Sequence, residues 1–326
     1  MKPFDVITIG AATRDVFLRS KEIRVVRDAA FSTGEGECFA LGSKIDVDDI
    51  VFETGGGATN AAVSFARQGL RTAFVGKIGA TDARGREILT ALRREHVNTS
   101  LVVLDRRQST AYAVLLLTAR GERTALVYRA ASADFHPRDF RSTGINSRWI
   151  YVSSLAGKLP ILKRIWRHAA STGTHIAWDP GVGELALGLS TLRPLLAQTT
   201  ILHVNQEEAA KLMGFGYEQD EASFDRLRRL VGGVTIVTGG TEGALAGTAT
   251  ESWRSATHSV QAVDTTGAGD AFTSGFVAAY LRCGGRIPVA LQFATANAES
   301  VIRRVGAKAG LLRSRTLRRP VTVIRR

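Results

Sequence analysis

The stretch VDTTGAGDAFTSGF, residues 263–276, has three small residues and then an acid where a helix is expected to begin. A helix start leaves backbone N–H groups without partners and carries a partial positive charge, so it attracts anions. Gly267, Ala268 and Gly269 would let a phosphate approach those groups closely. Asp270 would face the same point, where a carboxylate repels phosphate but can accept a proton from an attacking hydroxyl. The pattern indicates an anion hole with a general base, although a Gly-containing turn whose acid complements the helix dipole fits the same residues.

Six segments, in order along the chain, resemble the motifs of the ribokinase or PfkB-type sugar kinase family. They are IGAATRD, GGGATNAAVSFARQG, GKIGATDARG, VNQEEA, VTGGTEGA and DTTGAGDAFTSGF. The resemblance spans about residues 5–312. The chain contains neither a Walker A pattern nor a G-x-G-x-x-G after a strand, so the common nucleotide loops do not explain these segments.

The resemblance implies a kinase that uses ATP and Mg²⁺. It assigns Asp270 as the catalytic base and the amides of residues 267–269 as the anion hole. Asn205 and Glu208 match the N-x-x-E motif, which implies a place near the phosphates, with Glu208 binding Mg²⁺ through water. The same spacing is also that of a helix capping box, and both interpretations can hold together.

The resemblance also implies sites for the nucleotide and for the phosphoryl acceptor. The positions assigned to the nucleotide are Thr238, Gly240, Gly243 and Asn297. Those assigned to the acceptor are Asp15, Gly55, Gly56 and Asn60. A carboxylate and an amide can together bind two or three sugar hydroxyls, each of which is both donor and acceptor. Without the resemblance, these positions would be interpreted as turn and helix-start residues.

Many members of the family bind a monovalent cation beside the anion hole, so the resemblance implies a K⁺ site here. The matching positions are Asp264 and Thr266, with backbone carbonyls near Val301, Arg304, Gly306 and Gly310. An ion at this place would order the loop that forms the hole.

Two departures from the ribokinase pattern leave the acceptor open. Gly57 stands where ribokinases usually have Lys, and YVSSLAG lacks their ribose-binding Glu, with Ser153 or Ser154 nearest. A nucleoside acceptor would need an apolar base pocket, and a phosphosugar would need extra cations. The residues available are Phe17, Phe31, Phe39 and Tyr112 for a base, and Arg14, Arg107, Arg129 and Lys158 for a phosphate.

The elements that must position these residues alternate between strand and helix patterns. Strands are predicted at about 4–10, 72–79, 148–154, 174–180, 201–205 and 234–240, and helices at about 58–67, 83–96, 158–171 and from 207. Such alternation predicts an α/β fold whose mostly parallel sheet is covered on both faces. The resemblance implies a ribokinase-like three-layer sandwich.

Residues from about 15 to 53 and from about 100 to 130 break this alternation and are predicted to form a small β-sheet. TAYAVLLLT and RTALVYR are interpreted as a hairpin around ARGE. Such a sheet over the carboxyl ends of the main strands would act as a lid on a single domain of residues 1–326. Pairing of the exposed lid strands between two subunits would cover their edges, which makes a homodimer through the lid a hypothesis.

The composition of the 326 residues, with 44% hydrophobic and 22% charged, is ordinary for a soluble globular protein. No run of about 20 apolar residues predicts a membrane span, and the first residues indicate a strand rather than a secretory signal. Cys38 and Cys283 are far apart and make neither a disulfide framework nor a zinc site. These observations favour a cytoplasmic location without a membrane partner.

The formal net charge is +13, and residues 303–326 contain nine Lys or Arg and no acid. We interpret residues 313–326 as a basic C-terminal tail, solvated and partly frayed. Nucleic-acid binding is not favoured, because no recognition motif or interleaved aromatic residues accompany the charge. The positive potential would still draw anionic ligands toward the protein.

Together the patterns predict an ATP-dependent phosphotransferase that phosphorylates a hydroxyl, expected to be primary, of a sugar or related small molecule. The alternatives are a nucleoside kinase of the same family, a non-catalytic sugar- or nucleotide-binding protein and an RNA-associated protein. The sequence does not identify the acceptor.

Overall fold

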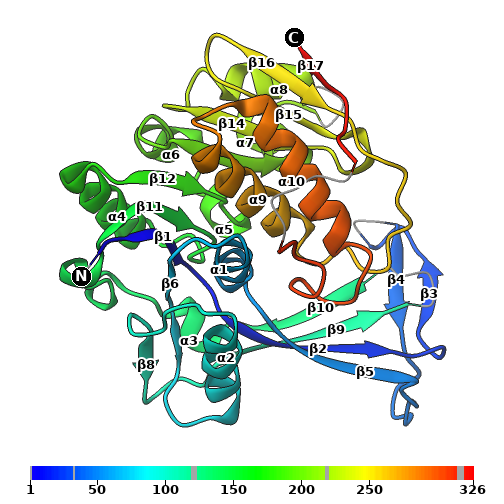
Figure 1. Ribbon diagram of the computed structural model, residues 1–326. Helices are drawn as coiled ribbons and strands as arrows, with labels where there is room; N and C mark the ends of the chain where they lie inside the picture. Colours follow the sequence, from blue (N-terminus) through cyan, green and yellow to red (C-terminus); the bar gives the residue numbers. More distant parts are fainter. Residues whose placement is uncertain (1, 32–33, 119–122, 217–219, 314–318) are drawn as a thin grey trace.

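The computed structural model describes residues 2–31, 34–118, 123–216, 220–313 and 319–326. Within these residues the larger sheet has nine strands (Figure 1). In spatial order they are β17 (Val323–Arg325), β16 (Ser252–Ser255), β15 (Ala244–Gly247), β14 (Val234–Thr238), β13 (Ile201–Asn205), β12 (His175–Trp178), β11 (Ser147–Val152), β1 (Phe4–Ile9) and β6 (Thr72–Val75). Neighbouring strands run parallel from β6 to β14, and β15 to β17 continue the sheet in antiparallel pairs. The mostly parallel sheet predicted from the sequence is confirmed.

Helices cover both faces of this sheet, because its central strands are apolar on both sides. Neighbouring strand residues such as Val6 and Ile7 are both fully buried but belong to different hydrophobic cores. The helices of one face are α1 (Gly57–Arg67), α9 (Ala268–Arg282) and α10 (Ile287–Val301). Those of the other face are α4 (Leu159–Thr172), α6 (Leu189–Leu196), α7 (Gln206–Met213) and α8 (Asp220–Leu227). The three-layer α/β prediction is therefore confirmed. No helix in the described segments combines the length and apolar character needed to cross a bilayer.

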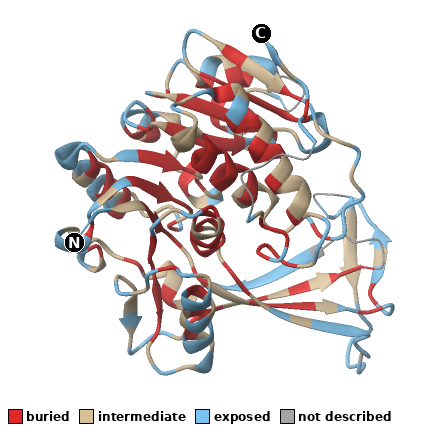
Figure 2. Cartoon of the chain, viewed as in Figure 1, coloured by how far each residue is buried: buried red, intermediate tan, exposed pale blue. Residues whose placement is uncertain are grey.

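A smaller sheet, which we call the lid, extends from one end of the main sheet (Figure 1). Its order is β10 (Arg123–Tyr128), β9 (Ala111–Leu117), β2 (Thr13–Arg19) and β5 (Asp49–Gly55). β9 and β10 pair antiparallel as expected, whereas β2 and β9 pair parallel. The predicted ARGE turn, residues 119–122, lies outside the described residues. Figure 2 shows that much of β5 and β10 is exposed, in contrast to the buried strands of the main sheet.

The predicted lid boundaries and one predicted strand need correction. Residues 72–79 are not one strand, because β6 ends at Val75 and β7 (Lys77–Gly79) pairs in parallel with β8 (Val103–Asp105) in a separate sheet. Gly76 separates them, and a Cβ there would lie 2.6 Å from the Gly10 carbonyl oxygen. β8 therefore does not belong to the lid. Between β2 and β5, β3 (Arg24–Arg27) and β4 (Glu35–Cys38) also form a sheet of their own.

The end of the chain is more ordered than the expected frayed tail. β17 pairs antiparallel with β16 and extends the edge of the main sheet. The Arg326 guanidinium lies 2.6 Å from the Glu221 carboxylate of α8. The interpretation of the whole segment 313–326 as a solvated terminus is wrong at its final strand, because ladder hydrogen bonds and acidic partners hold it.

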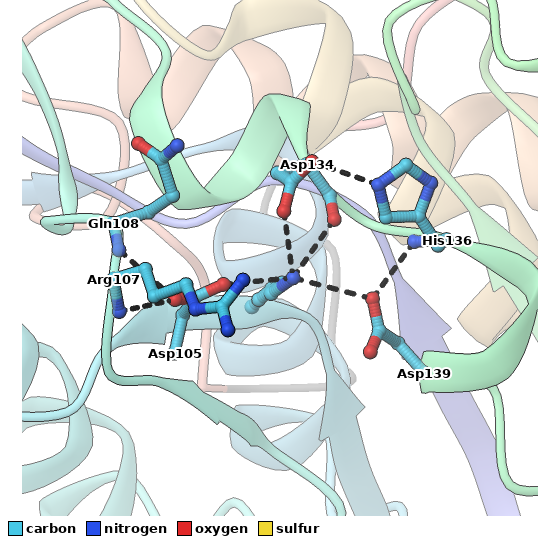
Figure 3. Close-up of polar contacts among 7 residues, drawn as sticks. Asp105, Arg107, Gln108, Asp134, His136 and Asp139 are labelled. Atoms are coloured by element: carbon cyan, nitrogen blue, oxygen red, sulfur yellow. Dashed lines mark hydrogen bonds and ion pairs between the residues drawn. The ribbon is translucent and has the colours of Figure 1, made fainter.

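A buried lysine holds the β7–β8 pair against the body of the protein. The Lys77 ammonium lies 2.8 Å from Asp105, 3.0 Å from Asp134 and 3.4 Å from Asp139. Figure 3 shows these carboxylates converging, with the His136 ring hydrogen-bonded to Asp134. The hydrogen bond from Lys77 lowers the pKa of Asp105 to about 2. Since three acids surround one buried cation, this cluster joins β7 and β8 to the segment after α3 (Ala130–Ala133).

Candidate active site

The predicted anion hole lies at the start of α9, where the backbone takes an unusual conformation. Gly267 is the residue before the helix and has φ of 74°, in the left-handed region that favours glycine. A Cβ at Gly267 would collide with Ala307. The Ala268 amide donates to the Thr265 carbonyl over 3.2 Å, so one of the three predicted amides already has a partner. Ala268 and Gly269 also line the cavity described below, so this helix start faces open space.

Asp270 lies in the first turn of α9 and accepts a hydrogen bond of 2.8 Å from the Asn60 amide. Burial and the neighbouring Asp179 raise the pKa of Asp270 to about 6, against the opposing effects of Asn60, Lys308 and His203. The carboxyl group is therefore mostly ionised at pH 7 and can still take up a proton. A pKa close to neutral pH is what a general base requires.

Beneath this carboxylate lies a buried polar network that the motifs did not predict. The Asp179 carboxylate lies 2.8 Å from His203 Nδ1 and accepts a hydrogen bond of 2.9 Å from the Tyr151 hydroxyl. His203 Nε2 lies 3.1 Å from Thr238 Oγ1. Burial alone would lower the pKa of His203, but the carboxylates of Asp179, Glu208 and Asp270 together outweigh it and raise that pKa, with Asp179 contributing most. A signal was present in the sequence, since Asp179 lies near the end of the strand predicted at 174–180 and His203 lies within the next, predicted at 201–205.

The predicted acceptor residues gather on the lid side of Asp270. Asp15, on β2, is buried, and burial raises its pKa. A Cβ at Gly55 would collide with the Asp15 carboxylate, so the Gly55–Gly56 segment packs directly against this acid. Within the described part of the chain, Asp15 Oδ1 and Asn60 Oδ1 are buried acceptors without a hydrogen-bond partner. Two open acceptors beside a base can receive hydroxyl protons from a ligand.

A cavity of about 610 Å³ lies on the other side of the start of α9. It brings together the predicted nucleotide residues Thr238, Gly240 and Gly243 with Ala268 and Gly269 of the predicted hole. The rest of its lining is Thr241, Thr257, His258, Ser259, Val260, Ala262, Thr265, Phe272, Thr295, Ala298, Glu299 and Ile302. Its mixture of apolar and polar side chains suits a flat ring at one end and phosphates at the other.

Asn297, also assigned to the nucleotide, is not among the residues that line this cavity. It is fully buried, donates 2.7 Å to the Ala271 carbonyl and accepts 2.9 Å from the Leu312 amide. The geometry gives it a bracing position between α9, α10 and the segment after them, while Thr295, Ala298 and Glu299 of α10 reach the cavity.

Asn205 and Glu208 form the capping box that their spacing allows. Asn205 Oδ1 accepts 2.8 Å from the Glu208 amide, and the Asn205 amide donates 2.9 Å to Glu208 Oε2. Burial raises the pKa of Glu208, and the carboxylates of Asp179 and Glu207 act in the same direction. A half-buried carboxylate with acidic neighbours is a fitting partner for a cation.

The predicted cation positions come together around the loop before α9. Asp264 is buried, with Oδ1 accepting from the Thr266 amide and hydroxyl and Oδ2 accepting from the Gly306 amide. The Val301 carbonyl accepts from the Arg304 amide, and the Gly310 carbonyl accepts from the Ser300 hydroxyl. An ion at this place would therefore rely on second lone pairs of carbonyl oxygens.

The two departures from the ribokinase pattern have structural explanations. A side chain at Gly57 would collide with Ser153 Oγ and approach Asp270 Oδ1 to 2.8 Å. An acid does approach the end of β11, since Glu184 of α5 (Val182–Leu185) accepts 3.0 Å from the Ser154 hydroxyl. Glu184 also accepts from the amides of Leu155, Gly157 and Gly181, so it organises the loop.

Several of the side chains considered for a base pocket or a phosphate have other partners. Phe17 belongs to the hydrophobic core of the lid, and Tyr112 lies under the Arg84 guanidinium. Arg14 lies 2.5 Å from the Glu87 carboxylate and over the Phe52 ring. Phe31 and Phe39 are exposed.

Comparisons with known proteins identify the family and the fold. The family described as "pfkB family carbohydrate kinase" matches residues 6–313. The chain is 25% identical over 277 residues to the ribokinase of Staphylococcus aureus, covering 83% of this chain and 89% of the relative. It is 30% identical over 264 residues to the aminoimidazole riboside kinase of Salmonella typhimurium, covering 75% of this chain and 79% of the relative. The structure of Arabidopsis thaliana ribokinase complexed with ribose and ATP has a TM-score of 0.74 and 22% identity, covering 95% of this chain and 96% of that one. The fold is therefore that of ribokinases.

The network beneath Asp270 predicts a measurable coupling between Asp179 and His203. Replacing Asp179 by Asn removes the charge that opposes desolvation, so the pKa of His203 should fall. The pH titration of the His203 ring by NMR measures this, with His203→Gln to assign the signal. Asp225→Asn, which removes an acid paired with Arg228, is the control. An unchanged His203 titration in Asp179→Asn would contradict the coupling.

Proposed function

The chain belongs to the pfkB family of carbohydrate kinases, and we propose that it transfers the γ-phosphoryl group of ATP to a hydroxyl, preferably primary, of a sugar or related polyol. One observation carries this proposal. Asp270, with a pKa of about 6, directly follows Ala268 and Gly269 in the wall of the cavity and is hydrogen-bonded to Asn60, one of the two open, buried acceptors. A base in that position would lie between the phosphoryl donor and the acceptor alcohol.

In the proposed reaction, the acceptor hydroxyl gives its proton to Asp270 while its oxygen bonds to the γ-phosphorus. The bond between that phosphorus and the bridging oxygen of ADP breaks. Amides at the start of α9 would stabilise the charge that develops on the phosphoryl oxygens. The phosphorylated acceptor and ADP then leave, and Asp270 loses its proton to solvent.

Glu208 and Asn205 are the proposed protein groups near Mg²⁺. The raised pKa of Glu208 supports this, because a divalent cation would relieve the burial of its charge beside Asp179. When bound, Mg²⁺ would neutralise charge on the phosphates. The chain itself would supply the carboxylate and the capping box that holds it in place.

A sugar fits the acceptor side better than a nucleoside. Asp15 and Asn60 offer oxygens that need O–H donors, which a polyol supplies. The aromatic residues considered for a base are core, exposed or covered by an arginine. The aminoimidazole riboside kinase relative keeps a nucleoside as the second candidate.

A homodimer through the lid is part of the proposal. The strand register puts Ile50, Leu126 and Tyr128 on the face of the lid opposite Asp15. These side chains are 49–57% exposed, whereas Phe17, Leu115 and Leu117, on the Asp15 face, are buried. An exposed apolar sheet face with unpaired edges is suited to a second copy of the same sheet.

Asp270→Asn should fold normally and lose on the order of 10²- to 10⁴-fold in turnover, because Asn cannot accept the hydroxyl proton. ADP release is measured across a panel of sugars and nucleosides, with Asp225→Asn as the matched control. In the wild type, kcat/KM should fall as pH drops through about 6, since Asp270 then becomes protonated. Near-normal turnover of Asp270→Asn with the best acceptor would refute the proposed base.

Potassium should raise activity if the loop at Asp264 binds a monovalent cation, because that loop carries the start of α9. The measurement compares ADP release in K⁺ and in tetramethylammonium at equal ionic strength. Equal rates in the two salts would remove the cation from the proposal.

Ile50→Glu combined with Leu126→Glu should convert a dimer into a monomer, because each subunit then brings like charges to the lid face. Sedimentation at several protein concentrations measures the change. Ile324→Glu is the control, since Ile324 is 54% exposed but lies on β17. A wild-type protein that sediments as a monomer at tens of micromolar would contradict the lid dimer.

A further inference from the structure

Lys308 is a buried cation that none of the sequence motifs assigned. It lies in the segment after α10 and is 7% exposed. Its ammonium donates to the Thr54 carbonyl on lid strand β5. Lysine is rarely buried without a partner, and an ammonium has three N–H groups, of which a carbonyl takes one.

The backbone of Lys308 is held firmly from the opposite side. The Arg67 guanidinium donates 2.6 Å to the Lys308 carbonyl and pairs at 2.6 Å with Glu95. The segment is thus fixed to α1, and the lysine side chain extends from this anchor to the lid. Because its backbone is fixed to α1 and its ammonium to β5, the Lys308 side chain is well positioned to contact a ligand bound between the body of the protein and the lid.

Charged groups surround the ammonium on the acceptor side. Burial lowers the pKa of Lys308 to about 8, and the nearby Arg67 acts in the same direction. The carboxylates of Asp15, Glu53 and Asp270 oppose this effect. In turn, the ammonium lowers the pKa of both Asp15 and Asp270. Thr54 adjoins Gly55, where a Cβ would collide with the Asp15 carboxylate, so the ammonium bound to the Thr54 carbonyl lies beside the proposed acceptor-binding acid.

We propose that Lys308 determines acceptor specificity, by donating a hydrogen bond to the oxygen of a hydroxyl beside the one that is phosphorylated. This inference rests on the proposed function. The same neighbouring hydroxyl donates its proton toward Asp15 Oδ1, which is buried and open. A hydroxyl can do both at once, whereas an ether oxygen cannot donate and a deoxy carbon can do neither. The site therefore selects a polyol with a hydroxyl next to the reacting one.

Acceptor preference gives the readout. With a sugar that has the neighbouring hydroxyl, Lys308→Met should lower kcat/KM by about 10- to 100-fold, the usual effect of one hydrogen bond to a charged group. With the matching deoxy acceptor the two enzymes should be nearly equal, and KM for ATP should not change. Lys163→Met, at an exposed lysine on α4, is the control.

The outcomes separate this inference from the proposed function. A wild-type enzyme that releases ADP with no acceptor in the panel contradicts the proposed function. Calorimetric binding of the polyol and of its deoxy match then still tests Lys308, since Lys308→Met should weaken the binding of the polyol alone. If the wild type is active but Lys308→Met keeps the wild-type acceptor preference, the inference is overturned. If Lys308→Met does not fold, the acceptor preference of Lys308→Gln decides in its place.

Discussion

The site depends on keeping one carboxylate, Asp270, partly desolvated at the positive end of a helix. Burial and Asp179 push its pKa up, while Asn60, Lys308 and His203 hold it down, and the result is a value of about 6. Stronger burial would leave the acid protonated and unable to act as a base. Greater exposure to water would lower its pKa and make it a weaker base. The surrounding side chains therefore have to balance opposing effects of similar size, and that balance requires a rigid support.

The fold supplies this support by joining elements that are distant in the sequence. The main sheet brings the carboxyl ends of β12, β13 and β14 under the start of α9, so Asp179, His203 and Thr238 form one network. The lid brings Asp15 from the opposite side, next to Gly55. Because open α/β sheets leave a crevice at the carboxyl ends of their strands, the alternation of strands and helices already determines where such a site can form.

The sequence predicted the features that depend on residues close together in the chain. The start of α9, the Asn205–Glu208 capping box and the alternation of the main sheet follow from short-range periodicity and spacing. The lysine at 308 and the Asp179–His203 pair could not be predicted in the same way, because their surroundings come from other parts of the chain. The strand predicted at 72–79 was wrong for a related reason, since packing of Gly76 against Gly10 separates β6 from β7. The final strand, β17, was not predicted, because the arginines of this segment are typical of a solvated basic tail.

The protein as a whole is positively charged, whereas the surroundings of Asp270 are rich in acids. In the proposed reaction both charges affect which ligands bind. The chain carries a formal net charge of +13, which attracts an anionic nucleotide from a distance. Close to Asp270, however, Asp15, Asp179 and Glu208 bring further negative charge, with Lys308 and His203 as the nearby cations. Such a local excess of acid disfavours a free polyphosphate and favours one that arrives with a divalent cation. It also favours an acceptor that is neutral and rich in hydroxyl donors over one that already carries a phosphate. Of the cations considered for a phosphate, Arg14 is paired with Glu87.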